Sequence, residues 1–294
     1  MPSTIIEKPK WLDKKISLGQ YKGLSSLLES LNLDTVCQQA RCPNMGECFY
    51  NGVATFLILG KICTRSCSFC AVTKAKPGAI DYDQPRRIAQ AVSRLGLRHV
   101  VITSVTRDDL SDAGAEIFTR TISCIKELGQ DINIEVLVPD FKANIESIKK
   151  VIDAGPDIFG HNLETVDRLY KQIRPDTDYK RSLAVLDAAK KINPDIYTKS
   201  GLLLGLGETE SEVLDVLSDL RSIACDFLSL GQYLAPSKRH FPVKEYISPH
   251  KFKWYKEKAH KLGFLHAECA PYVRSSYLAA QYISSEAGKG VCLG

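Results

Sequence analysis

Long apolar runs and concentrated charge are the two features that this 294-residue sequence most clearly lacks. No apolar run reaches the about 18 residues that a membrane-spanning helix requires, so we expect no membrane association. Residues 1–19 contain Glu7 and Asp13, have no arginine and have no apolar core, unlike a secretory signal or a transit peptide. We therefore expect the protein to lie in the cytoplasm, a reducing compartment.

The charged residues are also not concentrated along the chain. The 39 basic and 34 acidic side chains leave a formal net charge of +5, and the lysines and arginines are scattered. Because no dense basic run is present, we expect no nucleic-acid partner, whereas a mildly basic surface would suit an acidic protein substrate. Hydrophobic residues make up 44% of the chain, which is enough for a sizeable core.

Cysteine is abundant, with ten residues, six of which form two groups of three. Clustered cysteines in a reducing compartment more often bind metal or carry out redox chemistry than form disulfides. The more specific group is Cys63-Thr-Arg-Ser-Cys67-Ser-Phe-Cys70. Such a loop can place three thiolates around one face of a [4Fe–4S] cluster, which normally takes four, and so leave one iron open. The alternatives are a structural zinc site, although no fourth ligand is nearby, and three unrelated thiols.

The second group is Cys37-x4-Cys42-x5-Cys48, in a polar stretch that is expected to form loop and short helix rather than strand. It could hold a second cluster with one ligand that is not cysteine, or a zinc ion completed by another residue. The four other cysteines stand apart and are expected to be buried and inert, because free cysteine packs as a small hydrophobe. They are Cys124, Cys225, Cys269 and Cys292.

Short apolar or β-branched runs alternate with segments of helical periodicity along the rest of the chain. The runs expected to form strands are 54–60, 99–104, 132–138, 157–160, 197–204 and 227–231. The segments expected to form helices are 86–96, 114–129, 144–154, 180–192, 210–224 and 249–262. This alternation predicts an α/β fold with a parallel sheet, a partial (β/α)6 barrel whose active site lies at the carboxyl ends of the strands. We expect an N-terminal extension at 1–53, the barrel at 54–235 and a C-terminal extension at 236–294.

Nine segments, taken in order, carry a resemblance to a known family. They are CQQARCPNMGEC, ICTRSCSFCAV, VITSVTRDDL, VLVPDF, HNLETV, RPDTDY, TKSGLLLGLGE, LGQYLAPSKRH and VRSSY. A CxxxCxxC directly after a first strand is the mark of the radical S-adenosylmethionine (SAM) superfamily. The ordered set resembles the lipoyl synthase family over about residues 20–280, with a radical-SAM barrel between the two extensions.

The resemblance implies two [4Fe–4S] clusters, with SAM as a further cofactor. The cluster that binds SAM would be held by Cys63, Cys67 and Cys70. The auxiliary cluster would be held by Cys37, Cys42 and Cys48. The family completes that auxiliary cluster with a serine of an Arg-Ser-Ser-Tyr motif, here residues 274–277. We assign Ser276, with Ser275 as the alternative, and expect Arg274 to orient the serine.

The resemblance also implies contacts with SAM. The residues expected to make them are Asn162, Glu164, Lys199, Ser200 and Arg174. Each class has a structural alternative: Asn162 could cap a helix whose dipole Glu164 suits, Lys199 could be a solvated lysine, and Arg174 could form a surface ion pair. Thr103, Ser104, Arg107 and Asp108 follow a predicted strand and are expected at the same rim.

The implied reaction inserts two sulfur atoms, at C6 and C8 of a protein-bound octanoyl-lysine, to form the lipoyl cofactor. The hydrogens on these carbons are not acidic, so a side-chain base cannot remove them, whereas a carbon radical can. The resemblance implies that SAM is cleaved to methionine and 5′-deoxyadenosine to supply that radical. It also implies that the auxiliary cluster donates the sulfur.

The implied partners are octanoylated lipoyl carrier domains, namely E2 subunits and the glycine-cleavage H protein. An electron donor such as ferredoxin or flavodoxin and an iron–sulfur carrier for cluster repair are also implied, and we expect a monomer. The alternative enzyme is another sulfur-inserting radical-SAM protein, biotin-synthase-like or methylthiotransferase-like. A ferredoxin-like electron carrier would need about eight cysteines for two thiolate-bound clusters, more than the six clustered cysteines present. A zinc-stabilised binding module is the third alternative.

Overall fold

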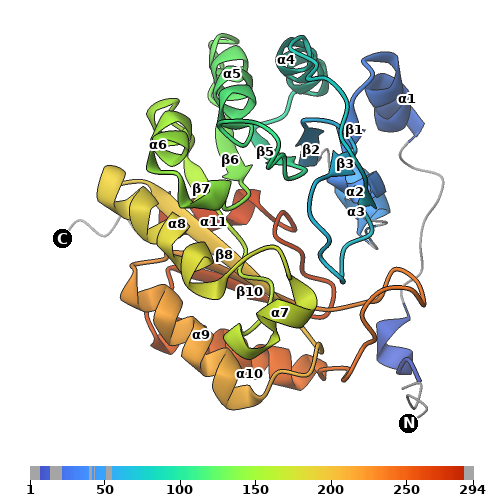
Figure 1. The fold of residues 1–294 in the computed structure, drawn as a ribbon, viewed down its shortest axis with the longest axis vertical. Coiled ribbons are helices and arrows are strands. Elements are labelled where there is room, and N and C mark those ends of the chain that lie inside the picture. Colours follow the sequence, from blue (N-terminus) through green and yellow to red (C-terminus); the bar gives the residue numbers. More distant parts are fainter. Residues whose placement is uncertain (1–6, 14–21, 40–41, 43, 51–54, 288–294) are drawn as a thin grey trace.

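One sheet of eight strands organises the chain, in the order β1-β2-β5-β6-β7-β8-β9-β10. The computed structural model describes residues 7–13, 22–39, 42, 44–50 and 55–287 (Figure 1). The strands are β1 (Asp34–Thr35), β2 (Thr55–Ile58), β5 (His99–Ser104), β6 (Asn133–Leu137), β7 (Ile158–Gly160), β8 (Tyr197–Leu204), β9 (Phe227–Gln232) and β10 (His266–Cys269). All pair in parallel except β1, which pairs antiparallel with β2. Because β1 and β10 are not paired, the barrel is open on one side.

Helices follow the strands and cover the outer face of the sheet (Figure 1). The main ones are α4 (Gln84–Leu95), α5 (Ala115–Lys126), α6 (Ile145–Asp153), α8 (Tyr179–Ile192), α9 (Glu210–Ser222) and α10 (Pro249–Lys261). Each lies within a few residues of its predicted range. The shorter ones are α1 (Lys22–Ser30), α2 (Val36–Gln39), α3 (Met45–Tyr50), α7 (Tyr170–Ile173) and α11 (Ala280–Ala287). None of the described helices is long and apolar enough to cross a bilayer.

Local sequence explains where several helices begin and end. Thr209 caps α9 and forms a capping box with Glu212, which satisfies backbone donors at the helix start. Asn144 caps α6 in the same way, through a hydrogen bond from the backbone of Ser147. Gly96 ends α4 in the left-handed conformation, with φ of 59°, which glycine adopts without steric cost. These signals fix the helix positions against the sheet.

The N-terminal ends of the strands carry a buried charged group inside the barrel. The Lys199 ammonium lies 2.9 and 3.1 Å from the two Glu135 oxygens. The ring of Tyr282, from α11, covers the same ammonium at 3.7 Å and packs on Phe227. We call Glu135, Lys199 and Tyr282 the barrel floor. Its third member comes from the C-terminal extension, so the extension fills part of the barrel interior.

The two extensions also contact one another. The Asn44 amide donates to the Tyr272 carbonyl at 2.5 Å, and the Tyr277 hydroxyl donates to Glu47 at 2.9 Å. The Tyr272 hydroxyl donates to the carbonyl of Leu12. The regions that carry the second cysteine group and the serine pair are therefore held side by side, although about 230 residues separate them.

Candidate functional site

A cavity of about 550 Å³ lies at the carboxyl ends of the strands, and both cysteine groups reach it. Its wall includes five of the six grouped cysteines, namely Cys37, Cys42, Cys63, Cys67 and Cys70. Ser275 and Ser276 also line it, whereas Cys48 does not. The fold thus gathers thiols from two separate segments and hydroxyls from a third around one space.

The cavity thiols are reduced and partly desolvated. The nine described cysteines form no disulfide with one another. Burial and, to a lesser extent, the neighbouring thiols raise the pKa of Cys37 and Cys70 to about 11. Such thiols stay protonated at neutral pH unless a cationic centre stabilises their thiolates. The donor set therefore fits an iron–sulfur cluster, whose irons supply that positive charge.

The cysteine trios are not arranged around a single ion. Among residues that the structure describes, no three Cys, His, Asp or Glu side chains are placed to hold one metal ion. A cubane cluster needs a different geometry, because each of its irons takes its own thiolate.

Buried ion pairs hold the loop that carries Cys63 and Cys67. Arg65 donates to both Asp108 oxygens at 2.7 and 2.8 Å, and to Asp140 at 2.6 Å. Asp140 is fully buried and also accepts from Arg181 at 2.8 Å. Burial opposes ionisation of Asp140, but the bonds and charge of Arg65 outweigh it and hold the pKa of that carboxyl well below its usual range. Loops after β5 and β6 thereby fix the cysteine loop.

Two further segments contact the same loop. Asp176 accepts hydrogen bonds from the backbone and hydroxyl of Ser66, at 2.7 and 2.8 Å. The backbone of Ser68 donates to Ile173 at 2.9 Å and accepts from Phe241 at 2.9 Å. The loop is therefore held from several sides, which favours a fixed placement of its thiols.

Asn162 and Glu164 form a polar wall of the same cavity. The Asn162 amide donates to Glu164 at 3.0 Å and to the Ser275 hydroxyl at 2.5 Å. Glu164 has a φ of 68°, a conformation that side chains rarely adopt and that is often found at functional sites. Burial raises the pKa of its carboxyl, and the charge of Arg174 opposes that rise. The helix-capping alternative for Asn162 is wrong, because the next helical turn begins only at Asp167.

Arg174 also lines the cavity and is buried, so the alternative of a surface ion pair is wrong. It donates to the carbonyls of Asn162 and Leu163 at 2.9 and 3.2 Å. Its Nε has no hydrogen-bond partner among the described residues. A buried guanidinium with an unused donor is suited to binding an anionic group.

Lys199 and Ser200 do not line the cavity, contrary to the expected contact with SAM. Lys199 is neither solvated nor free, because it pairs with Glu135 in the barrel floor. The Ser200 hydroxyl donates to the His161 carbonyl at 2.9 Å. The sequence alone did not reveal that Lys199 and Ser200 have partners far away in the chain, namely Glu135 and the His161 carbonyl.

Of the other residues expected at the rim, some line the cavity and some do not. Thr103 and Ser104 line the cavity, whereas Arg107 and Asp108 do not. Arg107 instead pairs with Asp109, and its donors also reach backbone carbonyls. Arg274 lines the cavity, and its guanidinium donates to the Val273 carbonyl at 2.6 Å.

Two glycines allow the cavity wall to pack closely, and their role was missed in the sequence. A Cβ atom on Gly201 would lie 2.3 Å from the Ser229 hydroxyl and 3.1 Å from Asn162. A Cβ on Gly231 would lie 2.0 Å from the Val273 carbonyl, so no other residue fits there without moving the backbone before Arg274. The sequence signal was the glycine at each of these strand positions.

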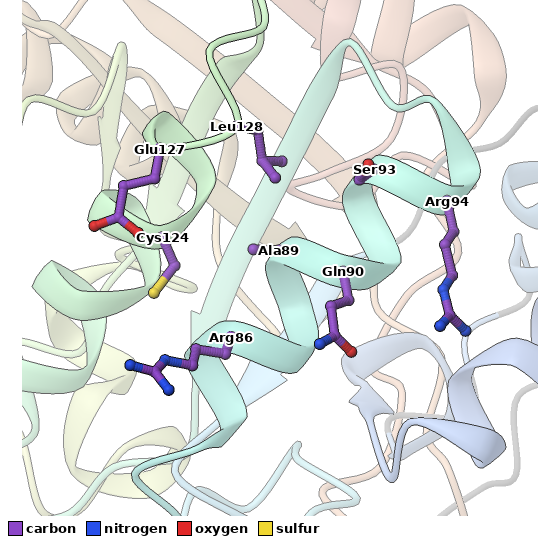
Figure 2. A pocket seen from close by; sticks show the side chains of 8 residues that line it. All are labelled: Arg86, Ala89, Gln90, Ser93, Arg94, Cys124, Glu127 and Leu128. Carbon is purple, nitrogen blue, oxygen red and sulfur yellow. The ribbon is translucent and has the colours of Figure 1, made fainter.

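A second cavity, of about 410 Å³, lies between α4 and α5 on the outside of the barrel (Figure 2). Cys124 lines it and is half-buried rather than buried as expected. Cys225 and Cys269 are buried, and burial raises the pKa of both to about 12, which fits inert thiols. Cys292 lies outside the described residues.

Known proteins share both the fold and most of the sequence. Residues 57–220 match the Radical SAM superfamily. Lipoyl synthase of Caldicellulosiruptor saccharolyticus is 54% identical over 94% of this chain and 97% of its own. Lipoyl synthase of Caldanaerobacter subterraneus subsp. tengcongensis is 53% identical over 92% of this chain and 95% of its own.

Solved structures agree in fold at low sequence identity. The [FeFe]-hydrogenase maturase HydG superposes with a TM-score of 0.57 and 16% identity, over 73% of this chain and 55% of that chain. SuiB of Streptococcus suis bound to S-adenosylmethionine superposes with a TM-score of 0.56 and 11% identity, over 76% of this chain and 51% of that chain. The chain spans about half the length of these two proteins, and the likeness concerns the fold alone. Together with the thiol-lined cavity, the sequence relatives show that the chain belongs to the lipoyl synthase family of the radical SAM superfamily, enzymes that insert sulfur.

Proposed function

We propose that this chain inserts two sulfur atoms into an octanoyl-lysine on a carrier protein, at C6 and C8, using SAM and two [4Fe–4S] clusters. The observation that carries the proposal is the single cavity lined by thiols of both cysteine groups and by Ser276. One cluster would be held by Cys63, Cys67 and Cys70. The other would be held by Cys37, Cys42, Cys48 and Ser276. When bound, these clusters supply the electron that cleaves SAM and the sulfur that enters the carbon chain.

The polar wall suits SAM. The Glu164 carboxylate can accept from the ammonium or ribose hydroxyls of SAM, and the Asn162 amide already holds that carboxylate. The unused Nε of Arg174 can bind the SAM carboxylate. The hydroxyl of Ser104 is buried without a partner among the described residues and offers a further polar contact.

The remaining wall suits an aliphatic substrate. Apolar side chains from three strands and a following loop face the cavity, among them Leu57, Val105, Leu137 and Leu203. An octanoyl chain buries apolar surface there, and the same side chains exclude water from a reactive radical.

The contacts of the two serines favour Ser276 as the ligand. The Ser275 hydroxyl accepts a hydrogen bond from Asn162, whereas the Ser276 hydroxyl has no hydrogen-bond partner among the described residues. An oxygen ligand matches iron in a sulfide-rich cluster less well than thiolate, so a weakly held iron could leave when sulfur is taken.

The test is anaerobic turnover of the reconstituted protein with SAM, a reductant and an octanoyl-lysine peptide. We expect 5′-deoxyadenosine, methionine and a dithiolane product by mass spectrometry. Ser276→Cys should keep both clusters, measured as about eight irons per chain, yet lose the dithiolane product. Ser275→Ala should keep the product.

Absence of any dithiolane from the wild-type protein would overturn the proposed reaction. A normal rate of dithiolane formation by Ser276→Cys would overturn only the role of Ser276.

A further inference from the structure

Two loops form neighbouring parts of the mouth of the thiol-lined cavity. Residues 64–80 contribute Phe69 and Val72 to its wall, and residues 233–244 contribute Leu234 and Pro236. The backbone of Phe241 donates to the Ser68 carbonyl at 2.9 Å, so the loops lie side by side. We call their exposed surface the mouth surface.

The mouth surface is strongly cationic although the chain as a whole carries only +5. Neither stretch contains an aspartate or glutamate. The exposed lysines and arginines on the two loops are Lys74, Lys76, Lys238, Arg239 and Lys244. Charge that is scattered in the sequence is therefore gathered in space.

The five mouth cations differ from many other exposed lysines in having no carboxylate partner in the part of the chain that the structure describes. Several exposed lysines elsewhere pair with nearby carboxylates, as Lys149 does with Asp153 and Lys191 with Asp187. Among the described residues, no ion pair involves any of the five mouth cations. The Lys74 ammonium donates only to the Cys67 carbonyl, at 2.9 Å.

The carboxylates that border the mouth surface are mostly engaged by arginines, as Asp108 is by Arg65 and Asp109 by Arg107. Asp81 follows the first loop and pairs with Arg87. Asp176 contacts the first loop through Ser66, and Glu245 follows the second. A net positive field therefore surrounds the entrance that a tethered substrate must pass.

We propose that the mouth surface docks an acidic face of the carrier domain that bears the octanoyl-lysine. The inference rests on the proposed function, since a chain tethered to a folded domain can enter the cavity only if that domain sits at the mouth. Complementary charge at an exposed rim accelerates association and lowers KM, and salt screens the effect.

The experiment compares two double charge reversals with equal change in net charge. Lys238→Glu with Arg239→Glu alters the mouth surface but no side chain of the cavity wall. Lys253→Glu with Lys261→Glu is the matched control, on exposed positions of α10. Each protein is assayed with an octanoylated carrier domain and with a short uncharged octanoyl-lysine peptide.

For the mouth variant we expect KM for the carrier domain to rise on the order of tenfold, with kcat little changed. KM for the peptide should stay the same, and added salt should raise the wild-type KM for the domain but not for the peptide. The control variant should behave as wild type. An unchanged KM for the domain, or an equal loss with the peptide, would overturn the docking surface.

Direct titration of the reconstituted protein with the octanoylated domain, without SAM, separates the two proposals. In one outcome the protein binds the domain in a way that depends on salt and on the mouth cations, yet forms no dithiolane. That outcome would refute the proposed reaction but support the docking surface. Binding of a DNA or RNA oligonucleotide that depends on Lys238 and Arg239, with no binding of the domain, would assign the surface to a nucleic acid and refute the proposal.

Discussion

His161 illustrates how burial fixes the state of a single group beside the cavity. Its Nδ1 lies 2.9 Å from the Val138 carbonyl, to which it donates, and its Nε2 has no hydrogen-bond partner in the described part of the chain. Burial, assisted by the charge of Arg174, lowers the pKa of His161 to about 4. The ring is therefore neutral at pH 7.

Neutral His161 makes the fold sensitive to mild acid. Below pH 6.5 the unfolded chain takes up a proton at this histidine, whereas the folded chain does not until about pH 4. The free energy of unfolding is therefore highest above pH 6.5 and falls as the pH decreases toward 4. The loss between pH 7 and pH 5 is about 2 kcal/mol. Urea unfolding at the two pH values measures this loss.

His161→Gln is the comparison, because glutamine can still donate to Val138 but does not titrate. The variant should lose less stability than wild type over the same pH interval. An equal loss in both proteins would show that other groups cause the pH dependence.

Sequence reasoning found the chemically distinctive residues and missed their partners. The spacing of the cysteines and the order of the motifs identified the thiols that now line the cavity. Asp140 and Glu135 were missed because their partners, Arg65 and Lys199, lie 75 and 64 residues away. No local pattern encodes a contact over such a separation.

At the scale of elements, Asp140 joins the loop after β6 to the cysteine loop. Asp140→Asn keeps the shape of the side chain but removes the charge that faces Arg65 and Arg181. Breaking a buried pair on one side costs about 3–5 kcal/mol, because the remaining charge is left uncompensated. We expect a lower unfolding midpoint and fewer irons retained per chain after gel filtration.

The matched control is Asp187→Asn, which removes an exposed carboxylate paired with Lys191 on α8. It should leave the unfolding midpoint and the number of irons retained per chain unchanged, since exposed pairs contribute about 0–1 kcal/mol. Full iron retention and normal stability in Asp140→Asn would refute the structural importance of this link.

Long periodic elements were predictable, and short ones were not. Strands β5 and β8 match their predicted ranges at both ends, because β5 contains the β-branched run VVIT and β8 ends with three leucines. The two-residue strands β3 (Ile62–Cys63) and β4 (Thr73–Lys74) and the four-residue α7 were not predicted. Elements of that length depend on tertiary contacts rather than on a sequence period.

At the scale of the whole molecule, the barrel floor joins the C-terminal extension to the barrel. Lys199 and Glu135 have relative exposures of 2% and 1%. Glu135→Gln leaves the Lys199 ammonium buried without its counter-charge, which should cost about 3–5 kcal/mol in urea unfolding. The double variant Glu135→Leu with Lys199→Met should recover much of that loss, because it removes both charges.

Glu116→Gln serves as the control for this prediction, as Glu116 forms a partly exposed pair with Lys150. Its effect should stay within about 1 kcal/mol. A double variant as unstable as Glu135→Gln alone would show that packing against Tyr282, rather than charge, dominates the barrel floor.

The wall of the thiol-lined cavity begins at Val36 and ends at Ser276. During synthesis the ribosome releases the amino end first, so Cys37 emerges long before the serine that faces it. At about 5–20 residues per second, the interval is about 12–50 seconds. Throughout that interval the first cysteine trio has no completed pocket around it. Stable loading of the proposed auxiliary cluster must therefore wait until translation is nearly finished, and premature stop codons before Ser276 should yield protein that cannot retain it.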